Sequence, residues 1–182
     1  MRKAIFLDRD GTLNHDSKAY VKSVDELKIF EETPTALKLF SRTGYLIIII
    51  TNQSGVGRNY FSEQELLKMH QKLIQTVKEE GGQIDAIYYC PHHPDDNCNC
   101  RKPGIANISK AMKRFDIDLE SSYFIGDSPK DIETGYRAGC KTVLVKTGLK
   151  DYSPHAVRQW KYEPDFIFDN ILQAAQSITE KG

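Results

Sequence analysis

The chain has 182 residues, and its 25 Lys and Arg balance its 25 Asp and Glu, so its formal net charge is zero. A neutral chain of this length suits one well-cored domain and is not expected to bind nucleic acid as its main function. We expect no membrane partner, because no apolar run approaches the ~18 residues of a spanning helix. Charged residues at positions 8–10 interrupt the first apolar run, which predicts a cytoplasmic protein without a signal peptide. No apolar surface stripe is visible, so we expect a monomer.

The first predicted strand, Ala4–Leu7, ends in two aspartates spaced two residues apart. Open α/β folds bind their ligands where strands end. Residues i and i+2 share one face of a strand, so the carboxylates of Asp8 and Asp10 would converge on one cation. Such a carboxylate pair suits Mg²⁺, which keeps several waters and binds phosphate oxygens. The alternative is an ordinary solvated turn.

The next segments read as a loop and a helix. Residues 15–25 lack periodicity and predict a surface loop or short flap over the first carboxylates. A helix is then predicted over Glu31–Thr43, with Thr33 as its cap and Pro34 in its first turn, and Gly44 ends it.

The most apolar run, Tyr45–Ile50, predicts a strand that is buried on both faces. It leads into a polar, Gly-rich loop, Thr51–Arg58, whose hydroxyl and amide groups suit a phosphate, although a plain connecting loop would have a similar composition. A capping-box sequence at Ser62 then predicts a helix that ends near Gly81. We expect His70 on the polar face of this helix.

A third predicted strand, Ile84–Tyr89, opens into a loop with three cysteines and two histidines within eleven residues. In a cytoplasmic protein such cysteines are more often metal ligands than disulfides. Structural zinc sites fill all four tetrahedral positions with Cys and His. Free thiols in a polar loop are the alternative. The expected zinc ligands are Cys90, His92, Cys98 and Cys100, with His93 as a replacement for His92.

Directly after this loop, Arg101 and Lys102 precede a helix predicted over Ile105–Phe115, an arrangement that favours an anion. A fourth strand, Ser122–Ile125, ends in a further carboxylate pair. Because parallel βα units collect strand ends on one edge of a sheet, these groups are expected to converge. The remaining predicted features are a helix at Glu133–Ala138, a buried Cys140, strands at Thr142–Val145 and Asp165–Phe168, and a helix at Ile171–Ile178.

Together these groups predict phosphoryl transfer in two steps. Asp8 would attack phosphorus as a nucleophile, and Asp10 would act as general acid and then as general base. Mg²⁺ would be held by Asp8, Asp127 and the backbone carbonyl of Asp10. Thr51 and Lys102 would bind the non-bridging oxygens. Asp131 would orient Lys102 or the outer coordination sphere of the metal.

The motifs Asp8-x-Asp10-Gly-Thr12, Thr51-Asn52, Lys102 and Gly126-Asp127-x-x-x-Asp131 resemble the four motifs of the haloacid dehalogenase-like (HAD) phosphatases. With the Thr51–Arg58 loop and the cysteine loop through Pro103, they resemble the heptose-1,7-bisphosphate 7-phosphatase family, over nearly the whole chain. The resemblance implies a single domain over residues 1–182 with a Rossmann-like, three-layer α/β/α fold, a mainly parallel sheet, a minimal cap and the zinc loop 90–100. It also implies substrate contacts from Asn52, Arg58 and Arg101.

In function, the resemblance implies Mg²⁺-dependent removal of the 7-phosphate through an aspartyl-phosphate. The product would serve nucleotide-activated heptose for lipopolysaccharide core or surface glycan. One departure is that Lys102-Pro103-Gly104-Ile105 is shorter than the family's Lys-Pro-x-Pro-Gly segment, which shapes the leaving-group pocket. Histidinol-phosphate phosphatases share similar motifs and are the alternative. A DNA 3′-phosphatase is disfavoured by the zero net charge, and a non-catalytic zinc-binding module by the converging carboxylates.

Overall fold

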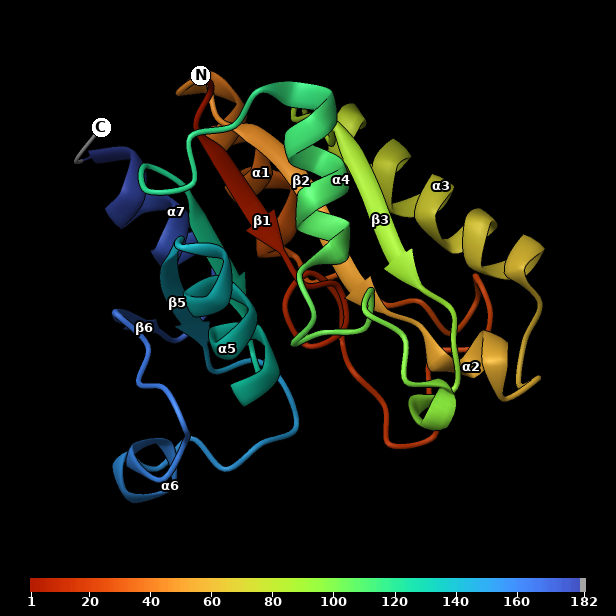
Figure 1. The fold of residues 1–182 in the computed structure, drawn as a ribbon. Helices are drawn as coiled ribbons and strands as arrows, with labels where there is room; N and C mark the ends of the chain where they lie inside the picture. Colours follow the sequence, from red (N-terminus) through yellow and green to blue (C-terminus); the bar gives the residue numbers. More distant parts are fainter. Residues whose placement is uncertain (181–182) are drawn as a thin grey trace.

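The computed structural model describes residues 1–180, in which six parallel strands form one sheet in the order β3-β2-β1-β4-β5-β6 (Figure 1). The first half of the chain adds strands on one side of β1, and the second half adds them on the other. The order therefore reverses between β1 and β4, and open sheets bind ligands outside the carboxyl ends of strands at such a point. The strands are β1 (Ala4–Leu7), β2 (Leu46–Asn52), β3 (Ala86–Cys90), β4 (Tyr123–Gly126), β5 (Lys141–Val145) and β6 (Phe166–Phe168).

Helices cover both faces of the sheet, which confirms the expected three-layer arrangement (Figure 1). The helices α4 and α5 lie on one face, and α1, α3 and α7 on the other. None of the helices within residues 1–180 has the length and apolarity that a membrane crossing requires. The helices are α1 (Glu32–Arg42), α2 (Ser54–Gly57), α3 (Glu63–Glu79), α4 (Ala106–Phe115), α5 (Pro129–Ala138), α6 (Pro154–Arg158) and α7 (Ile171–Glu180), with a short 3₁₀ turn at Pro94–Asp96.

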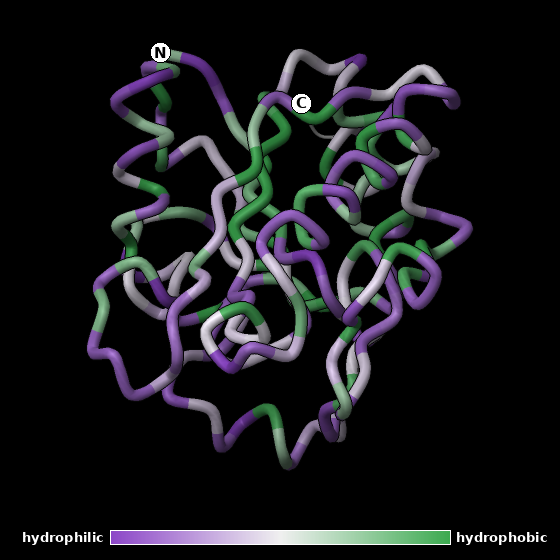
Figure 2. The backbone as a smooth tube through the Cα atoms, turned by 90° about the vertical axis from the view of Figure 1, so that its right-hand side faces the viewer, coloured by the Kyte–Doolittle hydropathy of each residue, from purple (hydrophilic) through white to green (hydrophobic). Residues whose placement is uncertain are grey.

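The run of isoleucines in β2 is explained by burial on both sides. Ile47 and Ile49 join the core under α1, α3 and α7, whereas Ile48 and Ile50 join the core under α4, and all four are fully buried. Each such side chain contributes about 1.5–3 kcal/mol by leaving water. Figure 2 shows hydrophobic segments running through the interior of the fold, whereas many segments on its outside are hydrophilic.

Several predicted boundaries differ from the structure, and two of these differences involve residues of the site. β2 continues through Thr51 and Asn52, and the loop predicted from Thr51 to Arg58 contains the one-turn helix α2. The reason is that Thr51 and Asn52 pair with Tyr89 and Cys90 of β3, which extends the parallel ladder into the polar segment.

The helix α5 begins at Pro129 rather than at Glu133. Its first turn is fixed by a capping box, in which the side chain of Asp131 accepts a hydrogen bond from the Ser128 backbone N–H at 3.1 Å. Proline is favoured at the first helical position, so both signals were present in the sequence. The consequence is that Asp131 is held on the first turn of a helix.

Two side chains in the helices were predicted wrongly. Thr33 does not cap α1, because its hydroxyl donates instead to the carbonyl of Leu13 at 2.7 Å. Ser62 caps α3 as expected, with its hydroxyl accepting from the Glu65 N–H at 3.1 Å. His70, however, is only 4% exposed, because α3 turns it toward Tyr89, with ring centroids 5.5 Å apart.

Candidate active site

Three carboxylates from separate segments meet where the strand order reverses. Asp8 follows β1, Asp127 follows the neighbouring strand β4, and Asp131 lies on the first turn of α5. We call these three residues the carboxylate cluster, since each offers one oxygen within 4.8 Å of the others. The structure thus brings Asp8 together with Asp127 and Asp131, and not with the side chain of Asp10.

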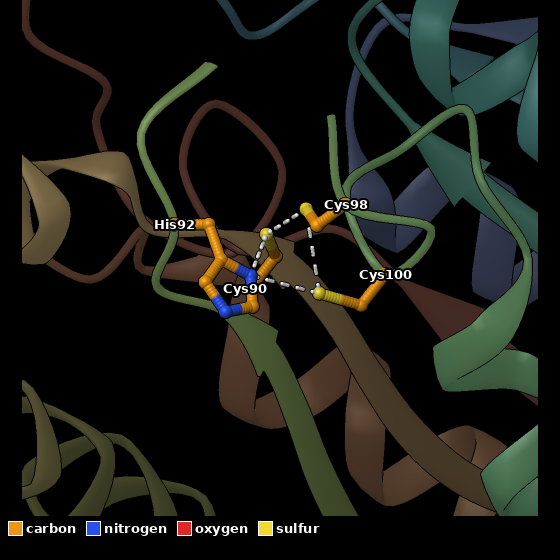
Figure 3. A group of neighbouring side chains, drawn as sticks. All are labelled: Cys90, His92, Cys98 and Cys100. Atoms are coloured by element: carbon orange, nitrogen blue, oxygen red, sulfur yellow. Dashed lines mark hydrogen bonds between the residues drawn. The ribbon is translucent and has the colours of Figure 1, made fainter. Parts of the chain in front are cut away.

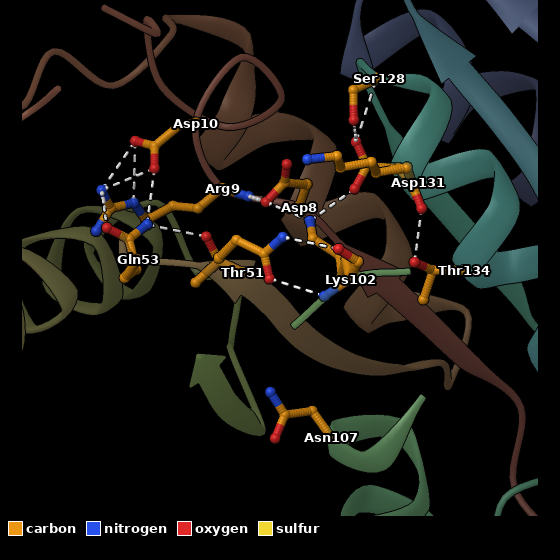
Figure 4. A network of polar contacts seen from close by, with 12 residues as sticks. Asp8, Arg9, Asp10, Thr51, Gln53, Lys102, Asn107, Ser128, Asp131 and Thr134 are labelled. Carbon is orange, nitrogen blue, oxygen red and sulfur yellow. Dashed lines mark hydrogen bonds and ion pairs between the residues drawn. The ribbon is translucent and has the colours of Figure 1, made fainter. Parts of the chain in front are cut away.

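The ammonium group of Lys102 lies between two members of this cluster (Figure 4). Its Nζ is 2.7 Å from Oδ1 of Asp8 and 2.6 Å from Oδ1 of Asp131. Burial alone would lower the pKa of Lys102, but the charges of Asp131 and Asp8 outweigh it and raise this pKa. Lys102 is therefore cationic, and Asn52 fixes its backbone by accepting from its N–H at 2.9 Å and donating to its carbonyl at 3.3 Å.

One lysine does not neutralise the cluster. Burial, opposed by Lys102 and reinforced by the charges of Asp131 and Asp10, raises the pKa of Asp8 to about 7. Burial and the charges of Asp131 and Asp8 raise that of Asp127 to about 8. A hard cation would relieve this repulsion, and a set of carboxylate oxygens beside a polar cavity is the kind that Mg²⁺ prefers.

Two glycines leave room for the carboxylate of Asp127. A Cβ on Gly11 would lie 2.7 Å from Cγ of Asp127, and one on Gly148 would lie 1.8 Å from its Oδ2. Gly11 also has φ +83°, a conformation that other residues rarely adopt. The Asp8–Thr12 motif therefore needs glycine at position 11 for two reasons: the positive φ of the backbone, and the room that the carboxylate of Asp127 takes up.

Asp10 lies on the opposite side of the site, where several donors hold its carboxylate (Figure 4). The Nη2 of Arg9 donates to its two oxygens at 2.8 and 2.9 Å, and Nε donates to Oδ1 at 3.2 Å. Asn14 Nδ2 and Gln53 Nε2 donate at 2.9 and 2.7 Å. Burial would raise the pKa of Asp10, but Arg9 and these hydrogen bonds lower it.

These groups line a polar cavity of about 340 Å³ at the carboxyl ends of the strands. Thr51 lies in it, with its hydroxyl accepting from Gln53 Nε2 at 2.9 Å. Three cations, Arg101, Lys130 and Lys150, also line it, whereas Arg58 is outside the lining of this cavity. Nη1 of Arg101 is buried without a hydrogen-bond partner among residues 1–180.

A second group of metal-ligand side chains lies at the end of β3 and in the loop that follows it (Figure 3). Neighbouring ligand atoms are 3.3–3.6 Å apart: Cys90–His92 3.6 Å, Cys90–Cys98 3.5 Å, Cys100–His92 3.3 Å and Cys100–Cys98 3.6 Å. With Zn–S of about 2.3 Å, the edge of a tetrahedral zinc site is about 3.8 Å, so the donors are close to zinc spacing. We call Cys90, His92, Cys98 and Cys100 the cysteine cluster.

His93 does not replace His92. Its Nδ1 accepts from the Asp95 N–H at 3.3 Å and so caps the 3₁₀ turn at Pro94–Asp96. Among residues 1–180 none of the four cysteines forms a disulfide, and Cys140 is buried as expected.

The segment of the cysteine cluster is hydrogen-bonded to the Thr51–Arg58 loop and leads directly into Lys102, which contacts the carboxylate cluster. Gln53 N–H donates to the Cys90 carbonyl at 2.8 Å, and Gly57 N–H donates to the Pro91 carbonyl at 2.8 Å. Lys102 follows the ligand Cys100 by two residues. The loop therefore fixes the segment from which Lys102 reaches the carboxylates.

Five site residues were missed from the sequence: Arg9, Asn14, Gln53, Lys130 and Lys150. A signal existed for Arg9, which stands between Asp8 and Asp10 directly after a buried strand. A charged side chain that is buried there needs a partner of opposite charge, and the neighbouring carboxylates supply one. Gln53 lies within the polar loop that was singled out. Nothing in the local pattern distinguished Asn14 or Lys150 from ordinary loop residues.

Comparison with known proteins gives concordant results. Residues 99–174 match the family model described as HAD-hydrolase-like. Two curated relatives are named D-glycero-beta-D-manno-heptose-1,7-bisphosphate 7-phosphatase. The one from Neisseria meningitidis is 39% identical over 99% of this chain and 96% of its own length. The one from Pseudomonas aeruginosa is 40% identical over 98% of this chain and 99% of its own length.

A solved structure has the same fold. The D,D-heptose 1,7-bisphosphate phosphatase from B. bronchiseptica, complexed with magnesium and phosphate, aligns with a TM-score of 0.90 and 33% identity. The alignment covers 99% of both chains.

Proposed function

The chain belongs to the HAD-like hydrolases, in the family of the heptose-1,7-bisphosphate 7-phosphatases, and we propose that it hydrolyses the 7-phosphate of D-glycero-β-D-manno-heptose 1,7-bisphosphate. The observation that carries this proposal is Lys102 bridging Asp8 and Asp131 beside Asp127, at the point where the strand order reverses. The names of the relatives favour the sugar bisphosphate over histidinol phosphate.

In the first step Asp8 attacks phosphorus, forms an aspartyl-phosphate and displaces the sugar oxygen. Lys102 and the hydroxyl of Thr51 bind the non-bridging oxygens, and Asp131 holds Lys102 in place through the 2.6 Å contact. Asp8, Asp127 and the backbone carbonyl of Asp10 would hold Mg²⁺. When bound, this ion supplies positive charge that offsets the negative charge of the phosphoryl group.

Asp10 transfers the protons of both steps. As a carboxylate, the form that Arg9 and the other donors favour by lowering its pKa, Asp10 takes a proton from the water that cleaves the aspartyl-phosphate. To give a proton to the leaving sugar oxygen in the first step, it has to be protonated first, against this lowered pKa. The donors from Arg9, Asn14 and Gln53 orient it for this exchange.

The cationic side of the cavity suits a substrate with a second phosphate. Burial and the charges of Arg101 and Lys150 lower the pKa of Lys130, which means that these cations are crowded together. An anionic group would relieve that repulsion. We assign substrate contacts to Arg101, Lys130 and Lys150. The predicted contact from Asn52, which lines the cavity and also supports the segment that carries Lys102, remains a prediction, as does the one from Arg58.

We propose that the cysteine cluster holds a structural zinc ion, since its four donors fill a tetrahedral site and leave no position for water. The shortened segment after Lys102 remains the feature to test for specificity. We further propose that the protein is a cytoplasmic monomer. Its product, heptose 1-phosphate, would then be the substrate for nucleotide activation.

The test is kcat/KM for phosphate release, with Mg²⁺, on both anomers of heptose 1,7-bisphosphate and on histidinol phosphate. We expect a preference of at least about a hundredfold for a heptose anomer, which corresponds to about 2.7 kcal/mol of differential transition-state binding. A preference for histidinol phosphate would overturn the substrate and leave the catalytic roles in place.

A further inference from the structure

The flap, residues 15–25, supplies the apolar surface of the catalytic cavity. Among the residues that line this cavity, Tyr20 and Val21 are the two with largely apolar side chains, and the others are charged or polar. Val21 is 6% exposed and belongs to the small core formed with Leu27, Leu66 and Met69. Tyr20 is therefore the apolar side chain that remains available to the carbon atoms of a ligand.

The backbone of Tyr20 is strained. Its φ is +68°, in the left-handed region that bulky residues rarely occupy, and its N–H donates to the Ser17 carbonyl at 3.0 Å to close a turn. Such strain persists where the surroundings determine the conformation, and it concentrates at sites that bind ligands.

A second aromatic residue holds the ring of Tyr20. The edge-on contact with Tyr60 has ring centroids 5.1 Å apart and an interplanar angle of 70°. Tyr20 also borders two outer hollows beside the flap, so its side chain forms part of the wall between them and the catalytic cavity. Without a substrate present, the ring of Tyr20 thus already contacts Tyr60, and the residue borders the catalytic cavity.

From these observations we infer that Tyr20 is a specificity-determining residue, whose ring contacts the carbon skeleton of the leaving group while the carboxylate cluster and Lys102 hold the phosphoryl group. The inference rests on the proposed phosphatase function. The C–H face of a sugar packs on an aromatic ring, and binding energy from this remote part of the substrate assists the reaction at phosphorus.

The test compares an organic monoester with acetyl phosphate, whose leaving group is too small to reach the flap. We expect Tyr20→Ala and Tyr20→Gly to lower kcat/KM for heptose 1,7-bisphosphate at least about tenfold and to leave acetyl phosphate within about twofold. Tyr20→Phe keeps the ring and retains most activity on both. Tyr136→Ala removes an exposed tyrosine on α5 outside the cavity and serves as the matched control.

Three outcomes overturn the inference: an equal loss on both substrates, no loss on either, or a loss in Tyr20→Phe as large as in Tyr20→Ala. Histidinol phosphate is measured in parallel, and the ester that the wild type prefers is the one compared with acetyl phosphate. A wild type inactive on both esters overturns the proposed function and the inference with it, whereas an active wild type with an unchanged Tyr20→Ala ratio overturns the inference alone.

Thermal unfolding gives an independent readout of the strain. At φ +68° we expect Tyr20→Gly to melt at a higher temperature than Tyr20→Ala, the reverse of the order at unstrained positions. The opposite order would contradict the view that the backbone, and not only the ring, is held for function.

Discussion

The two metal-ligand groups of this molecule are built in opposite ways. The cysteine cluster comes from one short loop, and its four donors are close to the spacing of a closed tetrahedron. The carboxylate cluster comes from two neighbouring strand ends and a helix, and its members repel one another even with Lys102 between two of them. All four donors of the cysteine cluster come from one short stretch of chain. The carboxylate cluster, in contrast, depends on the arrangement of the sheet, and one of its sides is open to the cavity.

This difference teaches how a structural site can serve a catalytic one. A closed site has all four of its coordination positions filled by the protein, so with the proposed zinc bound the loop of the cysteine cluster would act as a rigid support. In an open site whose carboxylates are not fully neutralised, a cation would relieve the repulsion between them. Lys102 belongs to both regions, because the loop fixes its backbone and the carboxylates hold its ammonium group.

The largest effect is expected for Asp8→Asn, which removes the proposed nucleophile from the carboxylate cluster and leaves the cysteine cluster intact. We expect phosphate release to fall by about 10³-fold or more, with zinc content and melting temperature near those of the wild type. Asp25→Asn, at an exposed flap position, is the control. Residual activity within tenfold of the wild type would rule out the nucleophile assignment.

Removing one ligand from the closed site tests its structural role. Cys98→Ala should lose zinc and destabilise the protein by more than about 2 kcal/mol, measured by denaturant unfolding and metal analysis. Activity should fall as well, because Lys102 loses its support. Cys140→Ala, a buried cysteine outside the cluster, should keep about one zinc per chain. Equal zinc content in the two variants would contradict the assignment.

The open site predicts a pH-dependent response to Mg²⁺. Because the pKa values of Asp8 and Asp127 are raised to about 7 and about 8 in the folded protein, their contribution to stability is present below pH 4 and is lost as the pH rises through 7–8. The rise in melting temperature on adding Mg²⁺ should therefore be larger at pH 8 than at pH 6. Asp127→Asn should remove most of this difference, and an equal rise at both pH values would count against the site.

The smallest effect concerns His70, which packs against Tyr89 next to Cys90 of the cysteine cluster and lies near Arg9. Burial, followed by the charge of Arg9, lowers its pKa to about 3, so the stability it contributes is complete above pH 6.5 and is lost as the pH falls toward 3. We expect the wild type to lose about 1–2 kcal/mol more between pH 7 and 5 than His70→Gln in urea unfolding. Parallel pH profiles for the two proteins would show that His70 is not the cause.

The sequence predicted the site best where residues with a chemical role stand at the end of a predicted strand or at the spacing of metal ligands. Asp8, Asp127 and the cysteine ligands followed from strand ends and ligand spacing, and the sheet followed from the alternation of apolar runs with helices. The sequence did not predict how the side chains of separate elements pack against one another. The burial of His70 depends on how α3 rotates against β3, and the separation of Asp10 from Asp8 depends on Arg9, whose side chain could have turned to solvent.

The reversal of strand order also has a consequence for how the chain folds during synthesis. Ala4 N–H donates to the hydroxyl of Ser122 at 2.9 Å across 118 residues of sequence, and β1 pairs with β4 along one of its two edges. An apolar strand made at the beginning of translation must therefore wait until the second half has left the ribosome. Over that interval its unpaired edge is open to aggregation, and chaperones that bind nascent chains would recognise this first strand.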